Sequence, residues 1–205
     1  MKLKHAETAV LLALAITMLV ATAFSSRQTE LSNKLVRLHV VANSDTDADQ
    51  SLKLAVRDAV LDTLAEPMRA ATTRDEGLRI INDHMGDILA AAQRVIADAG
   101  YGYTVSATLT SEDFPTRLYE HFTLPAGAYE SLRVTIGDGA GRNWWCVVYP
   151  PLCREIAVAE EVEEAFSELD EDEIRLITED IDSGDTKVKF RIFEIIGKIK
   201  RFFGK

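Results

Sequence analysis

An uncharged apolar run near the N-terminus constrains this chain more than any other feature of its sequence. From Ala9 to Phe24 there is no charged residue, and Leu, Ala, Val and Ile predominate. Lys2 and Lys4 precede the run, which closes on the small-x-small sequence Ala21-Thr22-Ala23. A basic start, an apolar stretch and such an ending are typical of a secretory signal peptide. The pattern predicts that residues 1–24 form a signal peptide or membrane anchor.

Three interpretations of the run stay open. It is shorter than the roughly 20 apolar residues that a membrane-spanning helix needs, which favours a cleaved signal over an uncleaved anchor. A buried helix of a folded core is the third interpretation. Residues 25–33 are polar, and we expect them to be a linker. The rest of the chain is then expected to be exported.

Hydrophobic periodicity predicts a strand and two helices after the linker. Residues 34–42 alternate in part between polar and apolar side chains, which favours a strand. Residues 49–65 and 74–99 carry apolar side chains at three- and four-residue steps, as amphipathic helices do. Pro67 and Gly100 are the expected ends of these two helices.

A β-rich region follows the predicted helices. Four stretches favour strands, namely residues 103–110, 118–124, 129–136 and 143–149. Short turns join the last three, and short turns join antiparallel neighbours. We therefore predict an α+β domain over residues 34–153, with an antiparallel sheet of four to five strands and two helices on one face.

The C-terminal region is strongly polarised in charge. Residues 155–185 contain 14 acidic residues and one basic residue, whereas residues 186–205 contain seven basic residues and one acidic residue. We expect an acidic helical segment over residues 154–186 and a basic amphipathic helix over residues 187–205. That helix either lies on an anionic membrane surface or packs against the acidic segment. The remainder carries no basic stripe with interleaved aromatics, which disfavours a nucleic-acid partner.

The chain contains two cysteines, Cys146 and Cys153. In an exported chain, an even pair at close spacing favours a disulfide. Two buried free thiols are the alternative. Zinc is disfavoured, because two cysteines without a nearby histidine do not provide four ligands.

The sequence shows no assembled catalytic or metal site. His39 lies in a predicted strand, where we expect a surface or hydrogen-bonded histidine. Asn43, Asp45, Asp47 and Asp49 resemble the start of a calcium loop, but the glycine and glutamate that complete such a loop are missing. A helix-capping loop is the simpler interpretation. We predict no catalytic residue, metal, cofactor or small-molecule substrate.

Two stretches carry a more specific pattern. One comprises residues 38–45 and 49–60, and the other runs from Phe114-Pro115-Thr116 to Cys153. The most specific part is the segment 143–153, with its Asn-Trp-Trp-Cys and Pro-Pro-Leu-Cys sequences. Over residues 34–153 the chain closely resembles stage II sporulation protein R of endospore-forming bacteria. The polarised tail lies outside this resemblance.

The resemblance implies signalling rather than catalysis. Members of that family are made in the forespore and exported into the space between the forespore and mother-cell membranes. There they activate a membrane-bound aspartic protease, which cleaves the pro-form of the sigma factor sigma-E. The resemblance thus implies a sigma-E-processing protease as the partner, and it carries over no catalytic residues.

We expect the partner-binding surface on two loops and a tryptophan pair, because loops on a rigid scaffold often carry recognition and Trp and Arg are favoured anchors. The candidate residues are Asn43, Ser44, Asp45, Arg142, Asn143, Trp144 and Trp145. Adjacent residues of a strand point to opposite faces, so at most one tryptophan is expected in the core. The alternative is that both tryptophans are covered and structural. Two other functions stay open: an exported hydrolase that uses Cys146, and a structural envelope protein held by residues 187–205.

Overall fold

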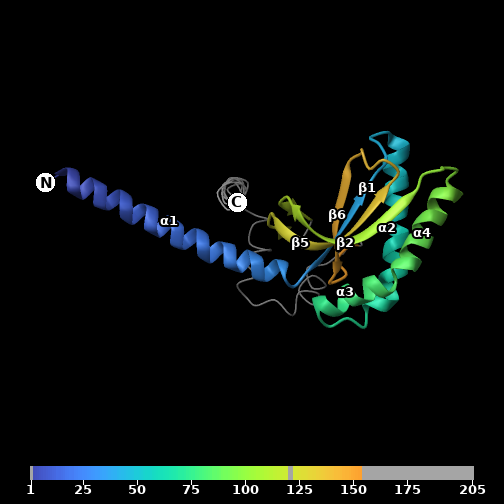
Figure 1. Ribbon diagram of the computed structural model, residues 1–205, viewed down its shortest axis with the longest axis horizontal. Helices are drawn as coiled ribbons and strands as arrows, with labels where there is room; N and C mark the ends of the chain where they lie inside the picture. Colours follow the sequence, from blue (N-terminus) through green and yellow to red (C-terminus); the bar gives the residue numbers. More distant parts are fainter. Residues whose placement is uncertain (1, 120–121, 154–205) are drawn as a thin grey trace.

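A long N-terminal helix precedes a compact α+β domain in the computed structural model (Figure 1). The structure describes residues 2–119 and 122–153. Helix α1 spans Lys2–Ser32, and its N-terminal part extends away from the domain (Figure 1). The predicted acidic segment and basic helix, residues 154–186 and 187–205, lie outside the described residues.

The main sheet has four strands in the order β2-β5-β1-β6. Their bounds are Val36–Val41 for β1, Val105–Phe114 for β2, Gly127–Ile136 for β5 and Asn143–Tyr149 for β6. Strand β1 pairs in parallel with β5 and antiparallel with β6, and β2 pairs antiparallel with β5. The sheet is therefore mixed, and the prediction of an antiparallel sheet is wrong.

The error has a physical cause in β1. All six of its residues are buried, which suits a central strand covered on both faces. Strand β1 lies between β5 and β6, so these two strands are not neighbours. The glycine-rich loop 137–142, which joins them, must cross the end of β1 instead of closing a hairpin.

Two further strands form a separate small sheet. Strands β3 (Arg117–Leu118) and β4 (Thr123–Leu124) pair antiparallel, with Arg117 opposite Leu124. The single strand predicted over residues 118–124 is thus a tight two-stranded ribbon.

Three helices cover one face of the main sheet, whereas the sequence predicted two. They are α2 (Asp47–Met68), α3 (Arg74–Asp83) and α4 (Met85–Asp98). The stretch predicted as one helix over residues 74–99 breaks at His84, which has a φ of −96° and a ψ of 12°. Pro67 does not end α2 but lies in its last turn. Gly100 follows α4 with a φ of +82°, as expected for a residue after a helix end.

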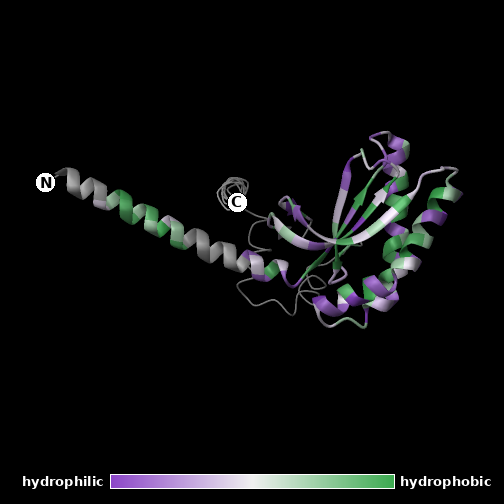
Figure 2. Cartoon of the chain, in the orientation of Figure 1, coloured by the Kyte–Doolittle hydropathy of each residue, from purple (hydrophilic) through white to green (hydrophobic). Residues whose placement is uncertain are grey.

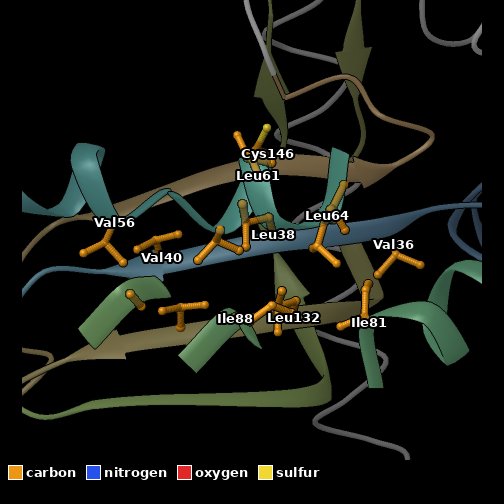
Figure 3. Close-up of a cluster of buried hydrophobic side chains, with 14 of the residues drawn as sticks. Val36, Leu38, Val40, Val56, Leu61, Leu64, Ile81, Ile88, Leu132 and Cys146 are labelled. Carbon is orange, nitrogen blue, oxygen red and sulfur yellow. The ribbon is translucent and has the colours of Figure 1, made fainter. Parts of the chain in front are cut away.

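The main hydrophobic core lies between these helices and the sheet (Figure 3). Leu38 and Val40 of β1 and Leu132 of β5 point toward Val56 of α2 and Ile88 of α4. All five side chains are fully buried. The apolar sides of the helices face the sheet, and polar residues predominate on their outer sides (Figure 2).

A second, smaller core covers the other face of the sheet. Its buried members are Leu31, Leu35, Phe114, Phe122, Leu124, Tyr129, Val147 and Leu152, with Tyr119 and Trp145 packed against them. Leu31 belongs to α1 and is completely buried, so the last turns of α1 pack on the domain. Farther out, the apolar side chains of α1 are exposed, as at Leu11 and Met18. None of the helices in the described ranges is long and apolar enough to cross a membrane.

Candidate functional site

The loop that crosses β1 joins the two predicted recognition loops into one surface. The backbone N–H of Ala140 donates to the carbonyl of Asn43 at 3.1 Å, and that of Gly141 donates to Ala42 at 2.9 Å. A Cβ on Gly141 would collide with the backbone of Ser44, so this close approach requires glycine. The sequence predicted both loops as candidates, but it did not predict their contact.

Asn43 connects the crossing loop to the start of α2. Its Oδ1 accepts from the backbone N–H of Asp138 at 3.0 Å, and its Nδ2 donates to Oδ2 of Asp49 at 2.9 Å. Ser44 Oγ donates to the same carboxylate oxygen at 2.5 Å. One asparagine therefore fixes three segments relative to one another.

Asp45 and Arg142 form the exposed part of this surface. The backbone N–H of Arg142 donates to Oδ1 of Asp45 at 2.6 Å, and the Arg142 Nε lies 3.6 Å from the same oxygen. Their side chains are 65% and 67% exposed, respectively. Beneath them, the buried Lys53 donates from Nζ to the carbonyl of Arg142 at 3.1 Å. The guanidinium thus lies on a well-supported backbone and faces solvent.

Hydrogen bonding and burial shift the pKa of two groups beneath the loops. The hydrogen bonds from Ser44 and then Asn43 lower the pKa of Asp49, because they stabilise its charged form. Burial is the main cause that lowers the pKa of Lys53, and the nearby positive charge of Arg142 adds to it. Asp49 therefore stays ionised at neutral pH and anchors the start of α2.

Asn143 connects the surface to a buried polar pair. Its Oδ1 lies 2.9 Å from Nε2 of His39, and Nδ1 of His39 lies 3.0 Å from Oε2 of Glu112. Arg133 also reaches that glutamate oxygen, at 3.4 Å. His39 is only 7% exposed and engages both ring nitrogens, which agrees with the expected hydrogen-bonded histidine.

The two tryptophans lie on opposite faces of β6 and are both half-buried. Trp144 packs against the main core, with the guanidinium of Arg57 4.3 Å from its ring centre. Trp145 packs against the second core, with the guanidinium of Arg117 3.7 Å from its ring centre. The structure thus brings Asn43, Ser44, Asp45 and Arg142 together, with Trp144 and Trp145 on separate faces of the strand that follows.

Cys146 and Cys153 are joined by a disulfide, with Cα atoms 5.3 Å apart. Cys146 is 3% exposed. A disulfide sulfur carries no thiolate, so this form offers no cysteine nucleophile. The bond ties the end of β6 to the chain after Pro150-Pro151.

The acidic loop does not assemble a metal site. Within residues 2–119 and 122–153, no three His, Cys, Asp or Glu side chains lie close enough to hold a metal ion. The Thr46 side chain instead accepts from the backbone N–H of Asp49, as an N-cap does. The loop is the helix-capping loop that its sequence indicates.

Sequence reasoning missed Lys53, which supports the Arg142 backbone, and Glu112, which contacts His39. Lys53 lies four residues after Asp49 on the apolar side of α2, a spacing that marks two charged groups on one buried face. Glu112 reaches His39 only through a pairing of distant strands, and nothing local to either residue signals it.

Comparison with known proteins identifies the family. The model of stage II sporulation protein R matches residues 32–159. The chain belongs to the stage II sporulation protein R family. A curated relative of that name from Bacillus subtilis (strain 168) is 38% identical over 123 residues, which cover 60% of this chain and 55% of the relative. The match thus spans about half the relative's length, and no solved structure matches. Both loops of the surface fall within the matched residues, and membership supports a role in sporulation.

Proposed function

We propose that this chain is an exported signalling protein of endospore formation, which acts between the forespore and mother-cell membranes. Its partner is a membrane-embedded aspartic protease, and the activated protease processes pro-sigma-E. Residues 187–205 hold the protein near a membrane surface.

The observation that carries this proposal is the family match over residues 32–159. The signal-like sequence of residues 1–24 supports export. The solvent-facing Asp45–Arg142 pair supports a protein partner, because arginine on a supported backbone is a favoured interface anchor.

The competing hydrolase hypothesis has less support. It needs Cys146 as a nucleophile, and Cys146 is buried and bonded to Cys153. The structural-envelope hypothesis differs from signalling in its dependence on the C-terminal helix. Deletion of residues 187–205 abolishes a structural role, whereas it only weakens activation of a protease.

Reconstitution of the purified protein with the candidate protease and pro-sigma-E in vesicles tests the proposal. We expect cleavage of pro-sigma-E to depend on the added protein and to saturate with its concentration. Cleavage that proceeds equally well without the protein would falsify the proposal.

A charge reversal locates the contact surface within the same assay. Arg142→Glu is expected to raise the concentration needed for half-maximal cleavage about 10-fold, which corresponds to about 1.4 kcal/mol of binding free energy. The matched control is Arg69→Glu, because the Arg69 side chain is 77% exposed and lies at the end of α2. Equal behaviour of the two variants rejects this surface while leaving activation itself intact.

A further inference from the structure

Two arginines lie on the sheet face opposite the helices, and the proposed contact surface uses neither of them. Arg37 of β1 is completely buried, with its Nε donating to the carbonyl of Cys146 at 2.9 Å. Its Nη2 donates to the hydroxyl of Tyr119 at 2.9 Å, and its Nη1 has no hydrogen-bond partner. The buried guanidinium thus contacts only neutral acceptors.

Aromatic rings surround both guanidinium groups. That of Arg37 lies 4.4 Å from the ring centre of Phe114 and 5.0 Å from that of Tyr129. That of Arg117 lies over Trp145, and its Nε also lacks a hydrogen-bond partner. We call Arg37, Arg117, Tyr119 and Trp145 the arginine cluster.

The arginine cluster lacks negative charge among the residues that the structure describes. None of the ion pairs there includes Arg37 or Arg117. A buried ion without a counter-charge costs several kcal/mol, whereas a cation–π contact returns about 0.5–2 kcal/mol. An arginine does not escape this cost by losing its proton. The cluster therefore favours a carboxylate brought from elsewhere.

The chain itself supplies carboxylates at this place. Leu152 is 5% exposed and belongs to the second core, which also contains Tyr119 and Trp145. The segment 155–185, with 14 acidic residues and one basic residue, begins three residues after Leu152. A tether this short gives an effective concentration on the order of millimolar, far above that of a free partner.

The surface beside the cluster also suits the apolar positions of that segment. Leu118, next to Arg117, is 59% exposed and offers an apolar side chain beside the cluster. The segment carries Ile156, Val158 and Val162 among its acidic residues. Charge and hydropathy thus point to the same occupant.

We propose that the arginine cluster is a docking site for the acidic segment 155–185 of the same chain. The carboxylates of the segment pair with Arg117 at the surface and offset the buried charge of Arg37 behind it. Its apolar side chains cover Leu118. This docking is independent of the protease, and it occupies the face that bears Trp145 while leaving Arg142 open.

Photocrosslinking within the full-length chain tests the docking. A benzoylphenylalanine replaces Leu118 in one sample and Arg69, on the far end of α2, in a control sample. We expect crosslinks from position 118 to fall within residues 155–185 of the same molecule. Mass spectrometry of a mixture of ¹⁴N and ¹⁵N protein distinguishes such crosslinks from those between two molecules. At about 1 M salt the Debye length falls to about 3 Å, and the crosslink yield should fall severalfold.

Charge variants provide the matched comparison. Replacement of Glu160, Glu161, Glu163 and Glu164 by Gln is expected to lower the crosslink yield at least threefold. Replacement of an equal number of basic residues by Gln within residues 187–205 is expected to leave it unchanged.

Three outcomes overturn the proposal: crosslinks to residues 187–205, crosslinks to a second molecule, or a crosslink yield that the replacement of the four glutamates by Gln does not lower. An absence of crosslinks from position 118 also counts against it. None of these measurements involves the protease, so the docking and the proposed function fail or succeed separately.

Discussion

Replacement of Asn43 by Ala tests whether one side chain holds the proposed contact surface together. The variant loses the bond from Asn43 Nδ2 to Asp49 and the bond from the Asp138 backbone N–H to Asn43 Oδ1. The first bond joins Asn43 to the first turn of α2, and the second joins it to a loop that is distant in sequence, so no other side chain provides the same two connections.

The magnitude follows from the two bonds. A hydrogen bond to a charged group contributes about 1.5–3 kcal/mol, and one between neutral groups contributes about 1 kcal/mol. The Asp138 N–H is exposed and gains a water partner in the variant, which reduces the second contribution. We expect the free energy of unfolding to fall by about 2–3 kcal/mol.

Urea unfolding followed by far-UV circular dichroism measures this loss, with an unchanged m-value as the sign that the denatured state is unaffected. The control is Asn33→Ala, which removes an exposed 3.3 Å contact to Arg74. We expect it to cost less than about 0.5 kcal/mol.

A double-mutant cycle between Asn43→Ala and Asp49→Ala isolates their contact. We expect a coupling energy of about 1 kcal/mol or more. A coupling near zero, or a loss for Asn43→Ala no larger than that for Asn33→Ala, would refute the reasoning about this junction.

Three further predictions probe other parts of the fold. Cys146→Ser and Cys153→Ser should each lower stability by about 2–3 kcal/mol, as loop closure predicts for so short a loop, and the double variant should lose no more than either single variant in urea unfolding. Gly141→Ala should cost about 1–3 kcal/mol in thermal unfolding because its Cβ meets the Ser44 backbone, whereas Gly86→Ala, with open space around it, should not destabilise the protein. The pKa of Asp49 is lowered in the folded protein, so its ionised form stabilises the fold above the unfolded-state pKa of about 3.9. Asp49→Asn should therefore be less stable than the unchanged protein at pH 7, and this difference in unfolding free energy should shrink as the pH falls below about 4. A difference that grows contradicts this sign.

Local patterns predicted much of the fold because they depend on neighbouring residues. The sequence predicted the strand at residues 143–149 with its observed bounds, and the strand near residues 36–41 within two residues. The helix predicted at residues 49–65 extends over Asp47–Met68. These elements depend on the propensity and spacing of neighbouring residues, and the start of α2 depends also on the capping side chain of Thr46.

The break between α3 and α4 escaped the periodicity argument. Asn82, Asp83 and His84 are weak helix formers, and Gly86 follows closely. Yet the apolar stripe continues through the break, with Ile81 and Ile88 both buried in the same core. Hydrophobic spacing alone does not distinguish one helix from two that share a buried face.

The position of β1 in the sheet also escaped sequence reasoning. A five-residue glycine-rich stretch between two strands indicates a hairpin when only neighbours are considered. The structure inserts β1 between those strands, so that it pairs with segments 94 residues away in β5 and more than 100 residues away in β6. The sequence of β1 did not indicate this position, because Leu38 and Val40 alternate with Arg37 and His39 as in a strand with one solvated face. In the structure Arg37 and His39 find buried partners on the other face.

The same insertion explains how the proposed contact surface is ordered within the folded domain. Because loop 137–142 crosses the end of β1, it meets the Asn43 loop and the start of α2 at once. The backbone of Arg142 is held by Asp45 and Lys53, so a partner that binds its guanidinium does not have to order the loop first. The ordering cost at this loop is then about 0.5–1.5 kcal/mol for the rotamer freedom of one side chain, in addition to the translational and rotational freedom that any association loses. For the signalling function that we propose, such an ordered surface means that the presence of the protein in the compartment can itself be the signal, because no change of its shape is needed for binding.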